Sequence, residues 1–71
     1  MNYYMKFRYK DQIVPWEKCK ATTLTGAKRE ASRVYGIAYR KVVLVIAEAD
    51  NDNGPFREIS SRKNMPKARW S

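Results

Sequence analysis

The residues of this chain that could carry out covalent chemistry are few. Its one cysteine, Cys19, lies between Lys18 and Lys20, and a cysteine beside lysines can act as a nucleophile once it is deprotonated. The sequence contains no histidine, which is the commonest general base and the usual partner of a catalytic cysteine. We therefore expect no enzymatic activity and interpret Cys19 as a buried or incidental thiol.

The acidic segment DNDNG, residues 50–54, has residue types that suit a metal ion. A calcium loop of the EF-hand type needs glycine at its sixth position and glutamate at its twelfth. Counted from Asp50, the twelfth residue is Ser61, and counted from Glu48, the sixth residue is Asn53. The spacing fails in both registers. We predict a hairpin turn here, for which Asn-Gly is a strong signal, and neither a metal site nor another cofactor.

Positive charge dominates the composition. Fifteen Lys and Arg residues face seven Asp and Glu residues, which gives a formal net charge of +8. A field of this sign attracts polyanions and acidic protein surfaces, and it argues against mimicry of DNA. Because 44% of the residues are hydrophobic and 13% are aromatic, we expect a folded protein rather than a disordered basic tail.

Length and cysteine content limit the architecture. The 71 residues suffice for one domain, which we predict to cover residues 1–71, with one small core. A single cysteine excludes an intramolecular disulfide and indicates a reducing compartment, so we expect a cytoplasmic protein. The longest apolar run, residues 42–47, is far shorter than the roughly 20 residues that cross a bilayer, and no membrane partner is expected.

The segment TLTGAKREASRVYG, residues 23–36, is typical of an amphipathic helix. Thr23 or Thr22 can cap its start, and Gly36 can end it in the left-handed conformation that glycine accepts. Gly26 is unfavourable in a first turn, and either a close approach to the sheet or to a partner, or a tolerated defect, would explain it. The apolar face comprises Leu24, Ala27, Ala31, Val34 and Tyr35, while Arg29 and Arg33 point away from it, with Ser32 nearby and Lys28 at its margin.

Four further segments are predicted to be strands. Residues 39–49 are rich in β-branched side chains, and residues 56–63 should return antiparallel to them after the turn. Residues 67–71, held by Trp70, are expected to add a short edge strand. Residues 2–10 alternate, so that Tyr3, Met5, Phe7 and Tyr9 face one side and Tyr4, Lys6, Arg8 and Lys10 face the other, wet side.

The remaining segment, residues 11–22, is predicted to be a connection. Pro15 interrupts the alternation, and Ile13, Val14 and Trp16 should tuck beneath the fold. The resulting order, β-α-β-β, predicts an α+β fold in which a three- to four-stranded antiparallel sheet carries one helix packed on one face.

Two basic surfaces are the candidate binding sites. On the wet strand face, an exposed Tyr4 among Lys6, Arg8 and Lys10 could stack on a nucleic-acid base, although a plain solvated face is an equal alternative. The second surface lies on the helix and comprises Lys28, Arg29, Ser32 and Arg33. Its alternative is again a solvated face, in which Arg29 or Arg33 pairs with Glu30 or Glu58.

The helix TLTGAKREASRVYG, the following KVVLVIAE at residues 41–48 and the KARW at residues 67–70 together resemble small phage-encoded anti-CRISPR proteins that act on type I surveillance complexes. The resemblance implies a stoichiometric inhibitor that docks on the guide-RNA-bearing Cas protein backbone and blocks binding or hybridisation of target DNA. The residues that match the motif and would contact this partner, its guide RNA or the target phosphates are Lys28, Arg29, Ser32 and Arg33. The alternative is a small basic module that binds nucleic acid without sequence specificity.

Overall fold

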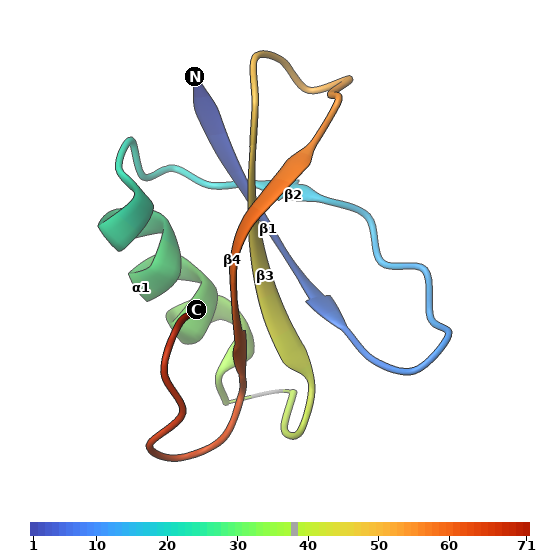
Figure 1. The fold of residues 1–71 in the computed structure, drawn as a ribbon, viewed down its shortest axis with the longest axis vertical. Coiled ribbons are helices and arrows are strands. Elements are labelled where there is room, and N and C mark those ends of the chain that lie inside the picture. Colours follow the sequence, from blue (N-terminus) through green and yellow to red (C-terminus); the bar gives the residue numbers. More distant parts are fainter. Residues whose placement is uncertain (38) are drawn as a thin grey trace.

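The computed structural model describes residues 1–37 and 39–71, which form one helix and a four-stranded antiparallel sheet (Figure 1). The predicted α+β fold, with the helix on one face of the sheet, is confirmed. The sheet has the strand order β2-β1-β3-β4. The elements are β1 (Asn2–Arg8), β2 (Glu17–Lys18), α1 (Leu24–Tyr35), β3 (Val43–Ala49) and β4 (Arg57–Lys63).

Strand β3 lies at the centre because its side chains are apolar on both faces. It pairs antiparallel with β1 on one side and with β4 on the other. Leu44 and Ile46 belong to the core on the helix side, and Val45 and Ala47, which alternate with them, are also buried. Both faces of the sheet are therefore covered around β3.

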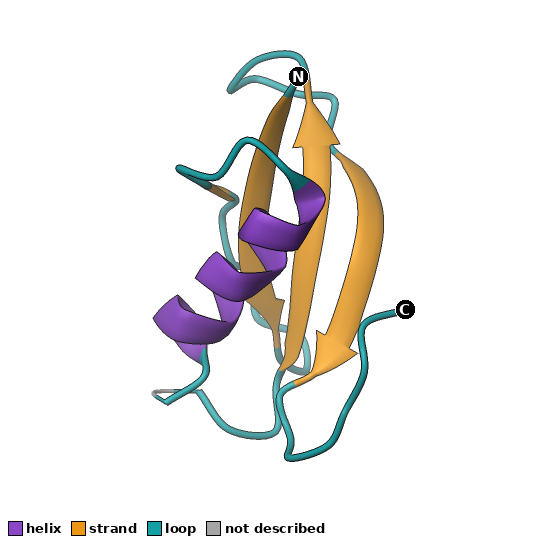
Figure 2. Cartoon of the chain, turned by 90° about the vertical axis from the view of Figure 1, so that its left-hand side faces the viewer, coloured by secondary structure: helices purple, strands orange, loops and turns teal. Residues whose placement is uncertain are grey.

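Helix α1 lies across one face of the sheet, as Figure 2 shows. It packs on the sheet through a narrow stripe of small residues. Ala27 and Ala31 are fully buried, and with Tyr35 they pack into the same core as Met5. The stripe repeats every four residues, so Val34 lies at its margin and is 38% exposed. The prediction that Val34 belongs to the apolar face is therefore wrong.

The predicted helix ends are correct in position. The Thr23 side chain caps the helix by accepting a hydrogen bond from the Gly26 amide at 3.1 Å. A side chain on Gly26 would come within 2.9 Å of the Ala21 side chain, so this glycine permits a close approach of the preceding loop. Gly36 follows the last turn but has φ −61°, not the predicted left-handed conformation. A side chain there would instead collide with the Ser32 carbonyl oxygen.

The strands are shorter than the sequence suggests. β1 ends at Arg8, and Lys10 has φ 49°, a left-handed conformation that belongs to a turn. β3 begins only at Val43, so the predicted strand from residue 39 includes four residues that precede it. The alternation of side chains continues past the last paired residue, and pattern alone does not show where pairing stops.

The fourth strand is not the predicted one. Glu17–Lys18 forms the short strand β2 beside β1, whereas residues 67–71 form no strand. The C-terminal segment is nevertheless held, because Ser71 and Ser61 exchange two backbone hydrogen bonds of 2.9 and 3.3 Å and Trp70 packs against the core. In the connection, Ile13 is 98% exposed, so its predicted burial is wrong.

Candidate binding surface

Most carboxylates of the chain are engaged within the fold. Glu30 accepts hydrogen bonds of 3.0 Å from the backbone amides of Lys20 and Ala21, which fastens the preceding loop to the helix. Glu17 accepts a bond of 3.1 Å from the Tyr35 hydroxyl. The remaining engaged carboxylates are Asp52, bonded to Tyr4, and Glu48 and Glu58, paired with Arg57 and Arg8.

The basic side chains are distributed differently. Within residues 1–37 and 39–71, Arg8 and Arg57 are the only ones of fifteen cations that form ion pairs. Five of the seven acidic groups thus form contacts within the fold, whereas most of the cations form no ion pair in the described part of the chain.

The sheet face opposite the helix is not the wet surface that the alternation predicts. Tyr4 is only 2% exposed, and its ring meets Phe56 edge-on at 4.9 Å. Trp16 stacks on Phe56 at 5.5 Å and completes the cover. The Tyr4 hydroxyl donates a hydrogen bond of 2.6 Å to Asp52, and this bond raises the pKa of the phenol. Tyr4 is therefore a core residue of this face, and its predicted place in a binding surface is wrong.

The cations of that face are also engaged. Lys6 Nζ lies 4.5 Å from the centre of the Trp16 ring, a cation–π contact. Arg8 Nη2 lies 2.6 Å from Glu58 Oε1, with both side chains about half exposed. Lys10 lies in the turn after β1, with its Nζ 5.2 Å from the centre of the Tyr9 ring. The alternation thus assigns Tyr4, Lys6 and Arg8 to the face opposite the helix correctly, but Lys10 lies beyond the strand and is not part of that face. These residues do not form one open basic patch.

The outer face of helix α1 is basic, as predicted. Arg29 and Arg33 are exposed, and neither forms the expected pair with Glu30 or Glu58, because these carboxylates already bind other partners. Ser32 is half-buried, and its hydroxyl accepts a hydrogen bond of 3.2 Å from Arg62. Ser32 is thus already engaged within the fold.

The C-terminal tryptophan lies beside this helix face between two cations. Arg62 and Lys28 lie 5.4 and 5.9 Å from the centre of the Trp70 ring. The same ring lines a shallow depression of about 360 Å³ with Thr25, Lys28, Arg29 and Ser32. From the KARW segment alone, the sequence predicts only a basic segment here. The contact between Arg62 and Trp70 arises because β4, which carries Arg62, pairs with β3.

A larger basic region lies where β1 ends, β3 begins and β4 ends. The strand register brings Arg8 beside Val43, and Val43 beside Lys63. We call the segments 9–12, 39–42 and 62–67 the basic end. Its cations are Lys10, Arg40, Lys41, Arg62, Lys63 and Lys67, against the single acid Asp11, whereas Glu48, Asp50 and Asp52 lie at the opposite end of the sheet.

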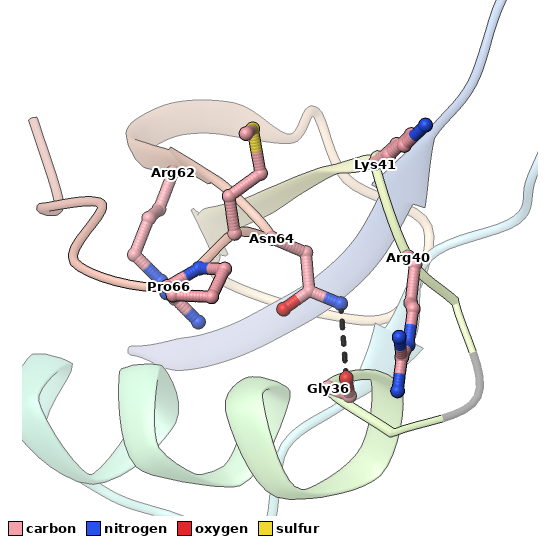
Figure 3. Close-up of a pocket in the computed structure, with 7 residues that line it drawn as sticks. Gly36, Arg40, Lys41, Arg62, Asn64 and Pro66 are labelled. Carbon is pink, nitrogen blue, oxygen red and sulfur yellow. Dashed lines mark hydrogen bonds between the residues drawn. The ribbon is translucent and has the colours of Figure 1, made fainter.

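A pocket of about 550 Å³ opens in the basic end between the helix C-terminus and the segment after β4 (Figure 3). Asn64 joins the segment after β4 to the helix C-terminus. Its amide nitrogen donates to the carbonyl oxygens of Gly36 at 3.2 Å, Tyr35 at 3.4 Å and Tyr39. Arg40 and Lys41 line the pocket, and they also line a second hollow of about 360 Å³ beside Tyr39.

Three lysines at the basic end adopt the left-handed conformation. Lys10, Lys41 and Lys67 have φ of 49°, 63° and 65°, and they are the only non-glycine residues with positive φ in the described part of the chain. This conformation costs a side-chain-bearing residue about 1 to 2 kcal/mol relative to glycine, and such residues concentrate at functional sites. The three left-handed lysines thus lie together at the end of the sheet where the basic side chains gather.

The structure offers no setting for catalysis at Cys19. The thiol is buried, and burial together with the nearby charges of Glu30 and Glu17 raises its pKa to about 12. Among the residues described, no three His, Cys, Asp or Glu side chains are grouped so that they could hold a metal ion. Nor does any described helix combine the length and apolar character required to cross a bilayer.

Comparison of the chain with protein-family models, with curated proteins and with solved structures found no match.

Proposed function

We propose that this protein is a nucleic-acid-binding module that contacts phosphates with its basic end and with the outer face of α1, without reading sequence. The division of charge is the main support. Carboxylates bind backbone amides, hydroxyls or two arginines, while Arg29, Arg33, Arg40 and Lys41 form no ion pair among the described residues. Contacts from such side chains to phosphates supply affinity that does not depend on base sequence.

The two basic regions form one surface because they meet at Arg62. This side chain lies against Trp70 beside the helix and also lines the pocket of the basic end. A nucleic-acid backbone that follows the surface would pass from Arg29 to Arg40 and Lys41. The folded protein measures 31 × 26 × 19 Å, so the module would cover only a short stretch of nucleic acid.

The direct test is binding of a fluorescently labelled oligonucleotide, followed by anisotropy across a salt titration. The logarithm of the association constant should fall with the logarithm of salt concentration, with a slope of about −0.9 per phosphate contact on duplex DNA and about −0.7 on single strands. The double variant Arg40→Glu with Lys41→Glu should weaken binding and make the slope shallower by about two contacts.

A matched control is available in and just after β2, the edge strand that carries Lys18. Lys18 and Lys20 are exposed, and replacing both by glutamate changes the net charge of the protein by the same amount. If this control weakens binding as much as the Arg40 and Lys41 variant does, only net charge matters and the proposed surface is wrong. If the wild type binds neither duplex nor single strands, the function itself is wrong.

We propose, as a second candidate, inhibition of a type I CRISPR surveillance complex through protein contacts. Its support is the resemblance of the sequence, together with the apolar side chains at the basic end. Ile37 and Met65 are 90% and 49% exposed and lie at the rim of the pocket or next to it in the chain. Methionine, tyrosine and arginine are enriched in protein interfaces. The exposed apolar side chain of Ile37 would not contribute to phosphate binding, whereas it could be buried against a protein partner.

This second candidate has its own experiment. The protein should co-elute with a purified surveillance complex at fixed stoichiometry and prevent the loading of target DNA. Ile37→Ser, which removes the apolar side chain without adding charge, should abolish that inhibition while leaving the affinity for free oligonucleotides unchanged. A protein that binds oligonucleotides but does not co-elute with the complex would leave only the first candidate.

A further inference from the structure

The hollow beside Tyr39 combines an aromatic ring with cations in a way that the sequence did not reveal. The Tyr39 ring lies flat on Phe7, with 4.3 Å between ring centres and 18° between ring planes. Tyr35 contacts Tyr39 edge-on at 5.9 Å. Tyr39 nevertheless remains 41% exposed, although two aromatic neighbours support its ring.

The backbone around this ring is held as well. The Tyr39 amide donates to the Tyr35 carbonyl oxygen at 3.0 Å, and the Tyr39 carbonyl accepts from Asn64. A ring that is already positioned loses little conformational entropy when a flat ligand stacks on it. Its exposed part adjoins the hollow that it lines with Tyr9 and Gln12.

Two cations connect this hollow to the larger pocket of the basic end. Arg40 and Lys41 line both. A phosphate bound between these side chains would place the attached nucleotide beside Tyr39. Single-stranded nucleic acid is recognised by this combination, in which a basic groove follows the backbone and aromatic rings stack on the bases.

We propose that Tyr39 is a stacking platform for a base of single-stranded DNA or RNA, with Arg40 and Lys41 binding the adjacent phosphates. The inference rests on the proposed nucleic-acid-binding function and specifies its substrate. In a duplex the faces of the bases are covered by their neighbours, so Tyr39 can contribute only to the binding of unpaired strands. The protein should therefore prefer single strands to duplexes of the same length.

The test compares three probes by fluorescence anisotropy: a short oligothymidine, an abasic strand of the same length and a duplex. Stacking on one aromatic residue contributes about 1 to 3 kcal/mol per base, so oligothymidine should bind about 5- to 150-fold more tightly than the abasic strand. Tyr39→Leu should remove this difference, because leucine fills the site but has no aromatic face. Tyr39→Trp should retain the difference.

The outcomes separate this inference from the function on which it rests. If the wild type binds oligothymidine and the abasic strand equally, phosphate binding stands and stacking is overturned. If none of the three probes binds, both proposals are overturned. NMR of the wild-type protein supplies a readout that does not depend on any variant folding. Stacking predicts ring-current shifts of the Tyr39 ring protons with oligothymidine and none with the abasic strand.

Discussion

On the sheet face opposite the helix, Lys6 lies over Trp16 and Arg8 pairs with Glu58, whereas at the basic end Arg40 and Lys41 line two hollows and form no ion pair among the residues described. Both regions carry an aromatic residue among cations. On the sheet face that residue, Tyr4, is sealed beneath Phe56 and Trp16. The comparison shows that the fold engages the basic and aromatic residues of one region and leaves those of the other partly exposed.

The largest expected effect is the difference in stability between alanine variants of Tyr4 and of Tyr39. Tyr4→Ala removes a buried aromatic ring and should lower the free energy of unfolding by about 3 to 5 kcal/mol. Tyr39→Ala removes a partly exposed ring that contacts Phe7 and Tyr35, and should cost less, about 1 to 3 kcal/mol, the range of two aromatic pairs. Urea denaturation followed by circular dichroism measures both.

Equal losses for the two alanine variants would remove the distinction between a sealed face and an open end. If Tyr4→Ala does not fold, Tyr4→Phe provides the measurement. It keeps the ring and removes only the hydrogen bond to Asp52, so it should cost about 1 kcal/mol.

Reversing charge should affect the sheet face and the helix face in opposite ways. Lys6→Glu with Arg8→Glu removes a cation–π contact and an exposed ion pair, and should lower stability by about 1 to 2 kcal/mol with little effect on oligonucleotide binding. Arg29→Glu with Arg33→Glu should leave stability unchanged and reduce the salt dependence of binding by about two contacts.

Denaturation midpoints measure the stability of these two double variants, and anisotropy titrations measure their oligonucleotide binding. A helix-face variant that binds as well as the wild type would reduce Arg29 and Arg33 to solvated surface. A sheet-face variant that loses binding at unchanged stability would return Lys6 and Arg8 to the candidate site.

Alkaline pH should destabilise the helix-side core, which contains Cys19. Its pKa is raised from 9.0 to about 12 in the folded protein, so the unfolded chain releases the proton first. The thiol's contribution is therefore complete below pH 9 and is lost progressively as the pH rises towards 12. Cys19→Ala should show a shallower decline of unfolding free energy across this window in urea denaturation. Parallel curves for variant and wild type would contradict the prediction.

The smallest effect concerns the backbone of the basic end. Lys41 has φ 63°, which glycine adopts without a side-chain penalty, so Lys41→Gly should be more stable than Lys41→Ala by about 1 kcal/mol. Both variants should bind oligonucleotides more weakly than the wild type. At Lys6, within β1, the order of stability should reverse, because glycine is unfavourable in a strand. Thermal denaturation of the four variants tests this contrast.

Local patterns were sufficient to predict most of the fold. The alternation of residues 2–10, the four-residue repeat in α1 and the Asn-Gly turn each depend on neighbouring residues in the chain, and the antiparallel sheet with its single helix follows from them. The Thr23 cap was predictable for the same reason, because its bond to the Gly26 amide spans only three residues. The exposure of Arg29 and Arg33 followed from helical periodicity.

The errors in the candidate site arose where residues distant in the sequence meet. Tyr4 was expected on an open surface, but its partners Asp52 and Phe56 come from a turn about fifty residues later. The sequence likewise gave no sign that Arg62 would lie against Trp70, or that Tyr39 would stack on Phe7. The short strand β2 depends on pairing with β1 rather than on its own two residues.

The sequence by itself thus determined the helix, the three long strands, most of their faces and the excess of positive charge, since these depend on residue type and on contacts between near neighbours. Only the tertiary structure decided which charges and aromatic rings remain exposed. A carboxylate such as Glu58 can neutralise one cation or another, and the choice depends on which side chain the strand register brings within reach. Burial depends in the same way on which loop closes over a face, and no local pattern contains that information.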